Sequence, residues 1–317
     1  MSALSNMMTV DVEDWFHILE FEGGHSRGDW AGLESRVEAN TDRLLGFFDE
    51  ASVLATFFVV GWVAERHPGL VRRIAEAGHE IASHSYWHEV IRCHTADSLA
   101  RDLGASRQLL EAASGTQVTG FRAPGASITP EVAWAFDVMI EQGYSYDASL
   151  CPGLSSHGGY PSPHAGPHRI RSDAGELVEI PSSTSEMLGR RVPYAGGGYL
   201  RLLPYPLIRR CISLDNQRGV PTNVYVHPRE IDPGQPRMPL GPLRRFKYYV
   251  GISGTEKKLR ALLRDFSWTS VRSWIDSHES EIAGRVLDVR EDAARAAPAP
   301  QSTSTPPHPP VAFEGAS

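Results

Sequence analysis

Two groups of polar residues have the types and spacing that metal-assisted hydrolysis needs. Three carboxylates, Asp11, Glu13 and Asp14, follow an apolar run, and crowded carboxylates raise one another's pKa unless a cation lies among them. His84 and His88 follow another apolar run. We expect their i, i+4 spacing to place both imidazoles on one face of a helical turn, within reach of one metal ion. Two histidines and one carboxylate would form a three-ligand site with an open position for water.

Two further polar residues lie where predicted strands end. Arg122 follows the run 118–121, where its guanidinium could hold a neighbouring carboxylate ionised and oriented. His227 follows the run 223–226, where an imidazole could donate a proton near neutral pH. Taken singly, these groups are also compatible with an acidic turn, a chance histidine pair, a plain ion pair and a core histidine. Together they predict a hydrolytic centre with a carboxylate base, an arginine that holds it, and a histidine acid.

The elements that must position these residues alternate between strands and helices. Strands are predicted at 7–12, 53–60, 80–83, 118–122, 177–180, 222–226 and 268–271, with helices between them, including one over 95–113. This alternation predicts an α/β fold with a mostly parallel sheet, either open or closed into a barrel, and a site at the carboxyl ends of the strands. The Gly-, Pro- and Ser-rich segment 151–200 is predicted to form long surface loops.

Composition limits the classes of function. The 317 residues are 41% hydrophobic and 22% charged, as in ordinary globular proteins, and the formal net charge of −7 argues against a nucleic-acid partner. We find no transmembrane segment and no secretory signal pattern, and three widely separated cysteines indicate a reducing compartment. We predict a catalytic domain over residues 1–289 and a disordered Pro/Ala/Ser-rich tail over 290–317.

The order of these segments resembles the NodB-homology polysaccharide deacetylases, carbohydrate esterase family four, over about residues 7–275. The matching motifs are Asp11-Val-Glu13-Asp14, His84-Ser-Tyr-Trp-His88, Arg122-Ala-Pro124, Tyr146-Asp147 and the strand-end His227. The stretches that begin at Asp11, Gly197 and Tyr225 are similar to a subgroup found with exopolysaccharide loci of the PEP-CTERM/exosortase type. The resemblance implies a distorted (β/α) barrel of the NodB-homology type with mostly parallel strands.

The resemblance also implies roles for the polar residues. Asp11 corresponds to the base and His227 to the acid, while Arg122 orients Asp11 and Asp147 orients or charge-balances His227. A divalent metal, with zinc as the first choice, is bound by His84, His88 and one carboxylate. Side-chain alternation along a strand favours Glu13 as that carboxylate, whereas similarity in residue type favours Asp14.

The substrate implied by the resemblance is an acetylated polysaccharide or oligosaccharide, which loses N-acetyl groups from its N-acetylhexosamine units. We expect Trp87, Pro124 and Tyr225 to bind it. The expected location is the cytoplasm at the inner face of the membrane, with peripheral association with an exopolysaccharide assembly complex. The alternatives are a metal-free amidohydrolase that acts on small cyclic ureides or imides, and a non-catalytic glycan-binding module.

Overall fold

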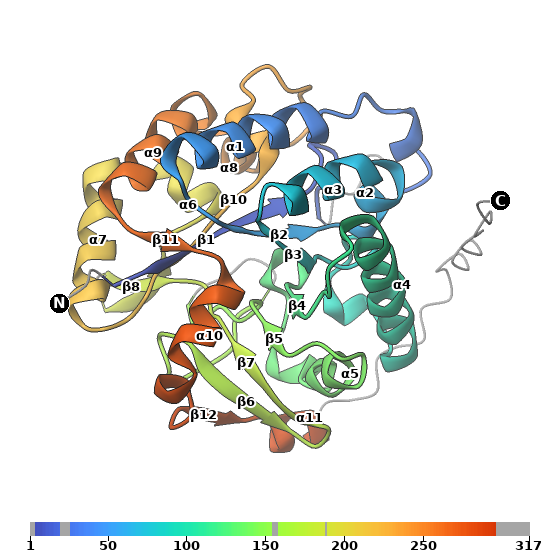
Figure 1. Ribbon diagram of the computed structural model, residues 1–317, viewed down its shortest axis with the longest axis vertical. Helices are drawn as coiled ribbons and strands as arrows, with labels where there is room; N and C mark the ends of the chain where they lie inside the picture. The colour runs from blue at the N-terminus through green and yellow to red at the C-terminus, as the bar shows by residue number, and fades with distance from the viewer. Residues whose placement is uncertain (1–3, 20–25, 154–157, 188, 296–317) are drawn as a thin grey trace.

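Six short runs form a continuous parallel series within a ten-stranded sheet in the computed structural model (Figure 1), which describes residues 4–19, 26–153, 158–187 and 189–295. In spatial order they are β10 (Asn223–Val226), β1 (Asn6–Val12), β2 (Thr56–Val59), β3 (Glu80–Ser83), β4 (Gly120–Phe121) and β5 (Tyr146–Asp147). The central strand β2 is buried on both faces, and its sequence is apolar except for Thr56, whose hydroxyl donates to Glu80. The predicted fold class, a mostly parallel α/β sheet, is confirmed.

The remaining strands are short and partly antiparallel. They are β6 (His168–Ser172), β7 (Gly175–Glu179), β8 (Thr184–Met187), β9 (Arg190–Pro193), β11 (Trp268–Thr269) and β12 (Val286–Asp288). β7 pairs parallel with β5 and antiparallel with β6, and β8 pairs antiparallel with β9. The prediction of long surface loops over 151–200 was therefore wrong from residue 168 on, while the described residues before it form no helix or strand. The glycines and polar residues there mark turns between short strands; Gly175, for example, has φ +141° at the start of β7.

The sheet curls into a distorted barrel. Arg122, just after β4, donates hydrogen bonds to Thr9 and Asp11 in β1, although β2 and β3 lie between these strands. Among the described residues no strand pairing joins β10 to β7. The amide of Asn223 instead donates to the carbonyl oxygen of Ile180 at 3.4 Å. Curling brings the carboxyl ends of β1, β3, β4 and β10 around one cavity.

Helices cover the outside of this sheet (Figure 1). They are α1 (Val37–Ala51), α2 (Gly61–Arg66), α3 (Pro68–Glu76), α4 (Ala96–Ser114), α5 (Ala135–Glu141), α6 (Gly197–Leu202), α7 (Tyr205–Gln217), α8 (Pro242–Tyr249), α9 (Ile252–Asp265), α10 (Val271–Ile282) and α11 (Arg290–Arg295). The helix predicted over 95–113 is confirmed as α4, which Thr95 caps and a left-handed Gly115 ends. No helix in the described ranges is both long enough and apolar enough to cross a bilayer.

Helix α11 occupies residues that we expected to belong to the disordered tail. The hydroxyl of the buried Tyr160 donates to Asp292 at 2.6 Å, and Glu291 pairs with Arg295 one turn later at 2.7 Å. The polar residues that suggested disorder here instead form an exposed helix, which the hydrogen bond between Tyr160 and Asp292 attaches to the rest of the domain. Residues 296–317, the rest of the predicted tail, lie outside the described residues, and the domain boundary at 289/290 stays a prediction.

Candidate active site

The end of β1 carries a buried carboxylate that an arginine holds from across the barrel. Asp11 accepts a hydrogen bond from Nη1 of Arg122 at 2.6 Å, and both side chains are buried. Arg122 also donates to Thr9 and to the carbonyl oxygen of Ala148, and its guanidinium lies 4.1 Å from the centre of the Phe58 ring. These contacts fix the guanidinium, so Arg122 orients Asp11 through a charge-assisted bond in a buried site.

Glu13, His84 and His88 form the group of side chains that could hold a metal ion. One ligand atom from each lies within 4.8 Å of the other two. Nε2 of His88 is 2.7 Å from Oε2 of Glu13, and Nδ1 of His84 donates to the carbonyl oxygen of Arg122 at 2.7 Å. The second bond leaves Nε2 of His84 as its metal-binding nitrogen and fixes the orientation of the ring.

The two histidines do not lie on a helical turn, as their spacing had suggested. Residues 84–88 form a loop after β3 in which Ser85 and His88 have positive φ values of +64° and +53°. The imidazole rings nevertheless lie 5.0 Å apart, centre to centre. The backbone turn, rather than helical periodicity, therefore brings the pair together.

The protonation states of this group fit a divalent cation. Burial lowers the pKa of His84 to about 4, which keeps its imidazole neutral at working pH. Burial alone would raise the pKa of Glu13, but His88, His227 and Arg229 outweigh it and hold that pKa well below its ordinary value. A neutral imidazole and an ionised carboxylate are the forms that bind metals, and two histidines with one carboxylate suit zinc or a related ion.

Asp14, the other candidate for the acidic ligand, points elsewhere. Its carboxylate accepts hydrogen bonds from the hydroxyl of Ser35 at 2.6 Å and from the backbone amides of Arg36 and Val37 at 3.0 and 3.3 Å. These are the amides at the start of α1, so Asp14 caps that helix from a distant part of the chain. Of the two alternatives that the sequence left open, Glu13 lies with the histidines and Asp14 does not.

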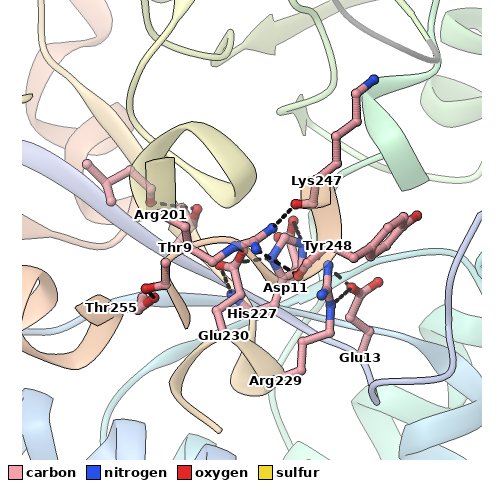
Figure 2. A network of polar contacts seen from close by, with 12 residues as sticks. Thr9, Asp11, Glu13, Arg201, His227, Arg229, Glu230, Lys247, Tyr248 and Thr255 are labelled. Carbon is pink, nitrogen blue, oxygen red and sulfur yellow. Dashed lines mark hydrogen bonds and ion pairs between the residues drawn. The ribbon is translucent and has the colours of Figure 1, made fainter. Parts of the chain in front are cut away.

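His227, at the end of β10, lies over the same carboxylates (Figure 2). Its Nε2 is 3.7 Å from Oδ2 of Asp11 and 3.6 Å from Oε1 of Glu13, and its Nδ1 is 3.2 Å from Oε2 of Glu230. Burial alone would lower the pKa of His227, but Glu230 and Glu13 outweigh it and raise that pKa above its ordinary value. His227 is therefore suited to carry a proton when a substrate arrives.

Asp147 does not contact His227, and the role predicted for it is corrected here. Among the described residues its side chain bonds to Ser149 and to Glu179, which lies beside it in register on β7. Burial and the neighbouring Asp147 raise the pKa of Glu179 well above its ordinary value, so this pair holds a proton inside the sheet. The register of β5 and β7 sets this pairing, which the sequence pattern did not reveal.

Three charged residues of the site were missed by sequence reasoning. Glu230 accepts from Arg201 at 2.8 Å, and Arg229 donates to Glu13 at 3.3 Å. Figure 2 shows this network beneath Lys247 and Tyr248, whose carbonyl oxygens accept from Arg201. The signal was the sequence His-Pro-Arg-Glu at 227–230: two charged residues in a turn that directly follows a strand at the site edge.

A cavity of about 490 Å³ opens above these groups. Its floor contains Asp11, Glu13, His84, His88, Arg122 and His227, and its walls include Tyr199, Leu202, Tyr225, Leu243 and Phe246. Tyr225 therefore lies where we expected a substrate-binding residue. Trp87 and Pro124 are not among the described residues that line the cavity: Trp87 packs near Arg27 and Trp30, and Pro124 is buried.

Comparisons with known proteins divide the chain into two parts. Residues 21–145 match the family described as polysaccharide deacetylase, and residues 148–276 match one described as domain of unknown function (DUF3473). Relatives include a peptidoglycan deacetylase from Helicobacter pylori, 33% identical over 39% of this chain and 40% of its own length. A chitooligosaccharide deacetylase from Sinorhizobium fredii is 36% identical over 31% of this chain and 44% of its own length. The chain thus matches less than half the length of these relatives.

A solved structure resembles the chain over more of its length. A crystal structure described as a polysaccharide deacetylase from Mycobacterium smegmatis has a TM-score of 0.58 and covers 89% of this chain and 94% of its own, with 22% sequence identity. At this level of identity the likeness concerns the fold. It extends through both parts of the chain, including the part that carries His227 and Glu230.

Proposed function

We propose that this chain, whose residues 21–145 match the polysaccharide deacetylase family, is a metal-dependent hydrolase that removes N-acetyl groups from N-acetylhexosamine units of a polysaccharide. The observation that carries this proposal is the set of side chains on one cavity floor. Glu13, His84 and His88 come within metal-binding distance of one another, beside the Asp11–Arg122 pair and His227. Amide hydrolysis needs a base, an acid and a means of stabilising negative charge, and this floor offers all three.

Asp11 acts as the base. Arg122 occupies Oδ1 of its carboxylate, which leaves Oδ2, 3.7 Å from Nε2 of His227, to accept a proton from the water that attacks the acetamide carbon. Glu13, His84 and His88 would hold the metal. A divalent cation bound there supplies Lewis acidity, which polarises the acetamide carbonyl and makes water easier to deprotonate.

His227 acts as the acid. As the carbon–nitrogen bond breaks, it donates a proton to the sugar nitrogen, so that acetate and a free amine leave. Without this proton the leaving group would be an amide anion, which departs poorly. Glu230 lies on the opposite side of the imidazole and favours its protonated form, so it positions and charges the acid rather than touching the substrate.

Finer parts of this proposal rest on the sequence patterns. We propose zinc as the metal, because two histidines and a carboxylate are a common zinc set. We propose an exopolysaccharide or its precursor as the substrate, with the enzyme at the cytoplasmic face of the membrane and in peripheral contact with an assembly complex. These points follow from the stretches that begin at Asp11, Gly197 and Tyr225.

Acetate release from a soluble N-acetylglucosamine oligomer tests the proposed function. We expect turnover by zinc-loaded protein, loss of turnover after chelation, and recovery when zinc is restored. Asp11→Asn should retain metal and release no acetate. Hydrolysis of a cyclic ureide without metal would favour an amidohydrolase, and oligomer binding without acetate release would favour a glycan-binding module.

A further inference from the structure

Helix α8 exposes apolar side chains at the mouth of the cavity. Leu243 is 69% exposed and Phe246 is 54% exposed, and Leu202 at the end of α6 is 50% exposed. All three line the same cavity. No residue of α8 is fully buried: Tyr248 and Tyr249 at its carboxyl end pack half-buried against the core, whereas Leu243 and Phe246 stay exposed. Large apolar groups gathered at one place on a surface mark a contact site.

The same helix is basic. Residues 233–255 contain Arg237, Arg244, Arg245 and Lys247 and no acidic residue, in a chain whose formal net charge is −7. Arg245 and Lys247 lie on the exposed part of α8, and Figure 2 shows the Lys247 side chain directed away from the polar network below it. The surface made by Leu202 and α8 therefore combines exposed Leu and Phe side chains with a local excess of positive charge. We call it the α8 surface.

The α8 surface is connected to the catalytic groups. The guanidinium of Arg201 donates to the carbonyl oxygens of Lys247, Tyr248 and Val250 at the end of α8. The same guanidinium donates to Glu230, which pairs with His227. The helix is thus held in a fixed position beside the cavity, so whatever binds α8 is brought to the cavity mouth.

We propose that the α8 surface binds an anionic lipid membrane and so places the cavity mouth at the bilayer. Aromatic and aliphatic side chains that enter the headgroup boundary, beside Lys and Arg that attract lipid phosphates, are the features of interfacial helices. A single eight-residue helix implies weak and salt-dependent binding. This inference depends on the proposed function at one point, where that function assigns a reaction to the cavity. The membrane contact itself is argued from the residues of the α8 surface.

Sedimentation with vesicles tests this inference. We expect the full chain to bind vesicles of 70% phosphatidylcholine and 30% phosphatidylglycerol at low salt and to bind them more weakly at high salt. We expect no binding to vesicles of pure phosphatidylcholine. Arg245→Glu should bind about 30-fold more weakly, because each basic residue near an anionic surface contributes a factor of about five and reversal counts twice. Arg245 does not line the cavity, so this variant should release acetate from soluble oligomers at the normal rate.

A matched control distinguishes binding by the α8 surface from nonspecific hydrophobic binding to vesicles. Leu54, which is 46% exposed, lies before the start of β2 and so at the opposite edge of the sheet from the cavity. Phe246→Ser should weaken vesicle binding, and Leu54→Ser should not.

Several results would overturn the inference. The first is no binding to anionic vesicles at low salt, and the second is vesicle binding by Arg245→Glu that equals that of the wild type. The third is binding of the protein to a soluble acidic polysaccharide as strong as its binding to vesicles. The fourth is a dimer in solution that Phe246→Ser dissociates. Acetate release without vesicle binding would contradict this inference alone, whereas vesicle binding without acetate release would contradict the proposed function alone.

Discussion

The two parts of the chain contribute to the site in different ways. Residues 6–147 supply Asp11, Glu13, His84, His88 and Arg122, each placed at or just after the end of a parallel strand. Residues 148–276 supply His227 from a strand end, but support it through Glu230, Arg201 and the end of α8. The first set is fixed by the sheet and the second by an ion-pair network that reaches the surface.

This difference suggests a division of labour. Residues 21–145 match a family described by its deacetylase activity and carry His84 and His88, while Asp11, the proposed base, and Glu13 lie on or just after β1, before the matched residues. The second part matches a domain of unknown function, and it carries His227, the proposed acid, and the cavity walls Tyr199, Tyr225 and Phe246. We infer that the first part provides the metal-binding side chains and the base, and that the second provides the proton donor and selects what reaches it.

The largest effect should come from the metal-binding group in the first part. His84→Ala or His88→Ala should lower deacetylation by about 10³-fold or more and abolish metal retention, because each removes one of three ligands. Acetate release and metal analysis measure both. His67→Ala is the control, since His67 also pairs with a glutamate, Glu38, at 2.8 Å, but lies apart from this site. Normal turnover by metal-free His84→Ala would contradict the assignment.

The acid in the second part should matter selectively. His227→Ala should slow acetamide hydrolysis by about 10²–10⁴-fold, the usual contribution of a general acid. Hydrolysis of 4-nitrophenyl acetate should fall less, because its leaving group needs no proton. The measurement is the ratio of the acetamide hydrolysis rate to the ester hydrolysis rate, compared between the wild type and His227→Ala. Equal losses on both substrates would remove His227 from the acid role.

The effect of Glu230 on His227 should show in the pH dependence of kcat/KM. Glu230 raises the pKa of His227, so Glu230→Gln should lower it. A general acid works only while protonated, and its activity is lost as pH rises through its pKa. The alkaline limb of kcat/KM should therefore move to lower pH, by about one unit, with activity recovered at acidic pH. Glu256→Gln, which changes a half-buried acid on α9 that pairs with Arg43 and Arg260, should leave the limb unchanged, and an unmoved limb in Glu230→Gln would argue for a structural role.

The smallest effect should come from the acidic residue that lies outside the site. Asp14→Asn should reduce the free energy of unfolding by about 1 kcal/mol, because it weakens the cap of α1. Thermal unfolding measures this change. Acetate release should stay near normal, and a loss comparable to that of His84→Ala would place Asp14 in the catalytic machinery.

Much of the first part could be predicted from sequence because its residues follow strands. The carboxyl ends of neighbouring parallel strands meet, so a polar residue that follows each apolar run is expected at a common edge. This reasoning groups Asp11, His84, His88, Arg122 and His227 from their positions in the sequence alone.

What could not be predicted depends on partners far away in the chain. The choice between Glu13 and Asp14 turns on Ser35 and two amides at the start of α1. The pairing of Asp147 with Glu179 follows from strand register. Glu230 acquires its role only when Arg201, 29 positions earlier, folds over it. In each case a tertiary contact, rather than the local sequence, decides what a charged residue does.

The metal content of purified variants tests the account most directly. Wild type and Asp14→Asn, stripped, reloaded with zinc and dialysed, should each retain one ion per chain, while Glu13→Gln retains none. If Glu13→Gln kept its zinc and Asp14→Asn lost it, the group formed by Glu13, His84 and His88 would not be the metal site.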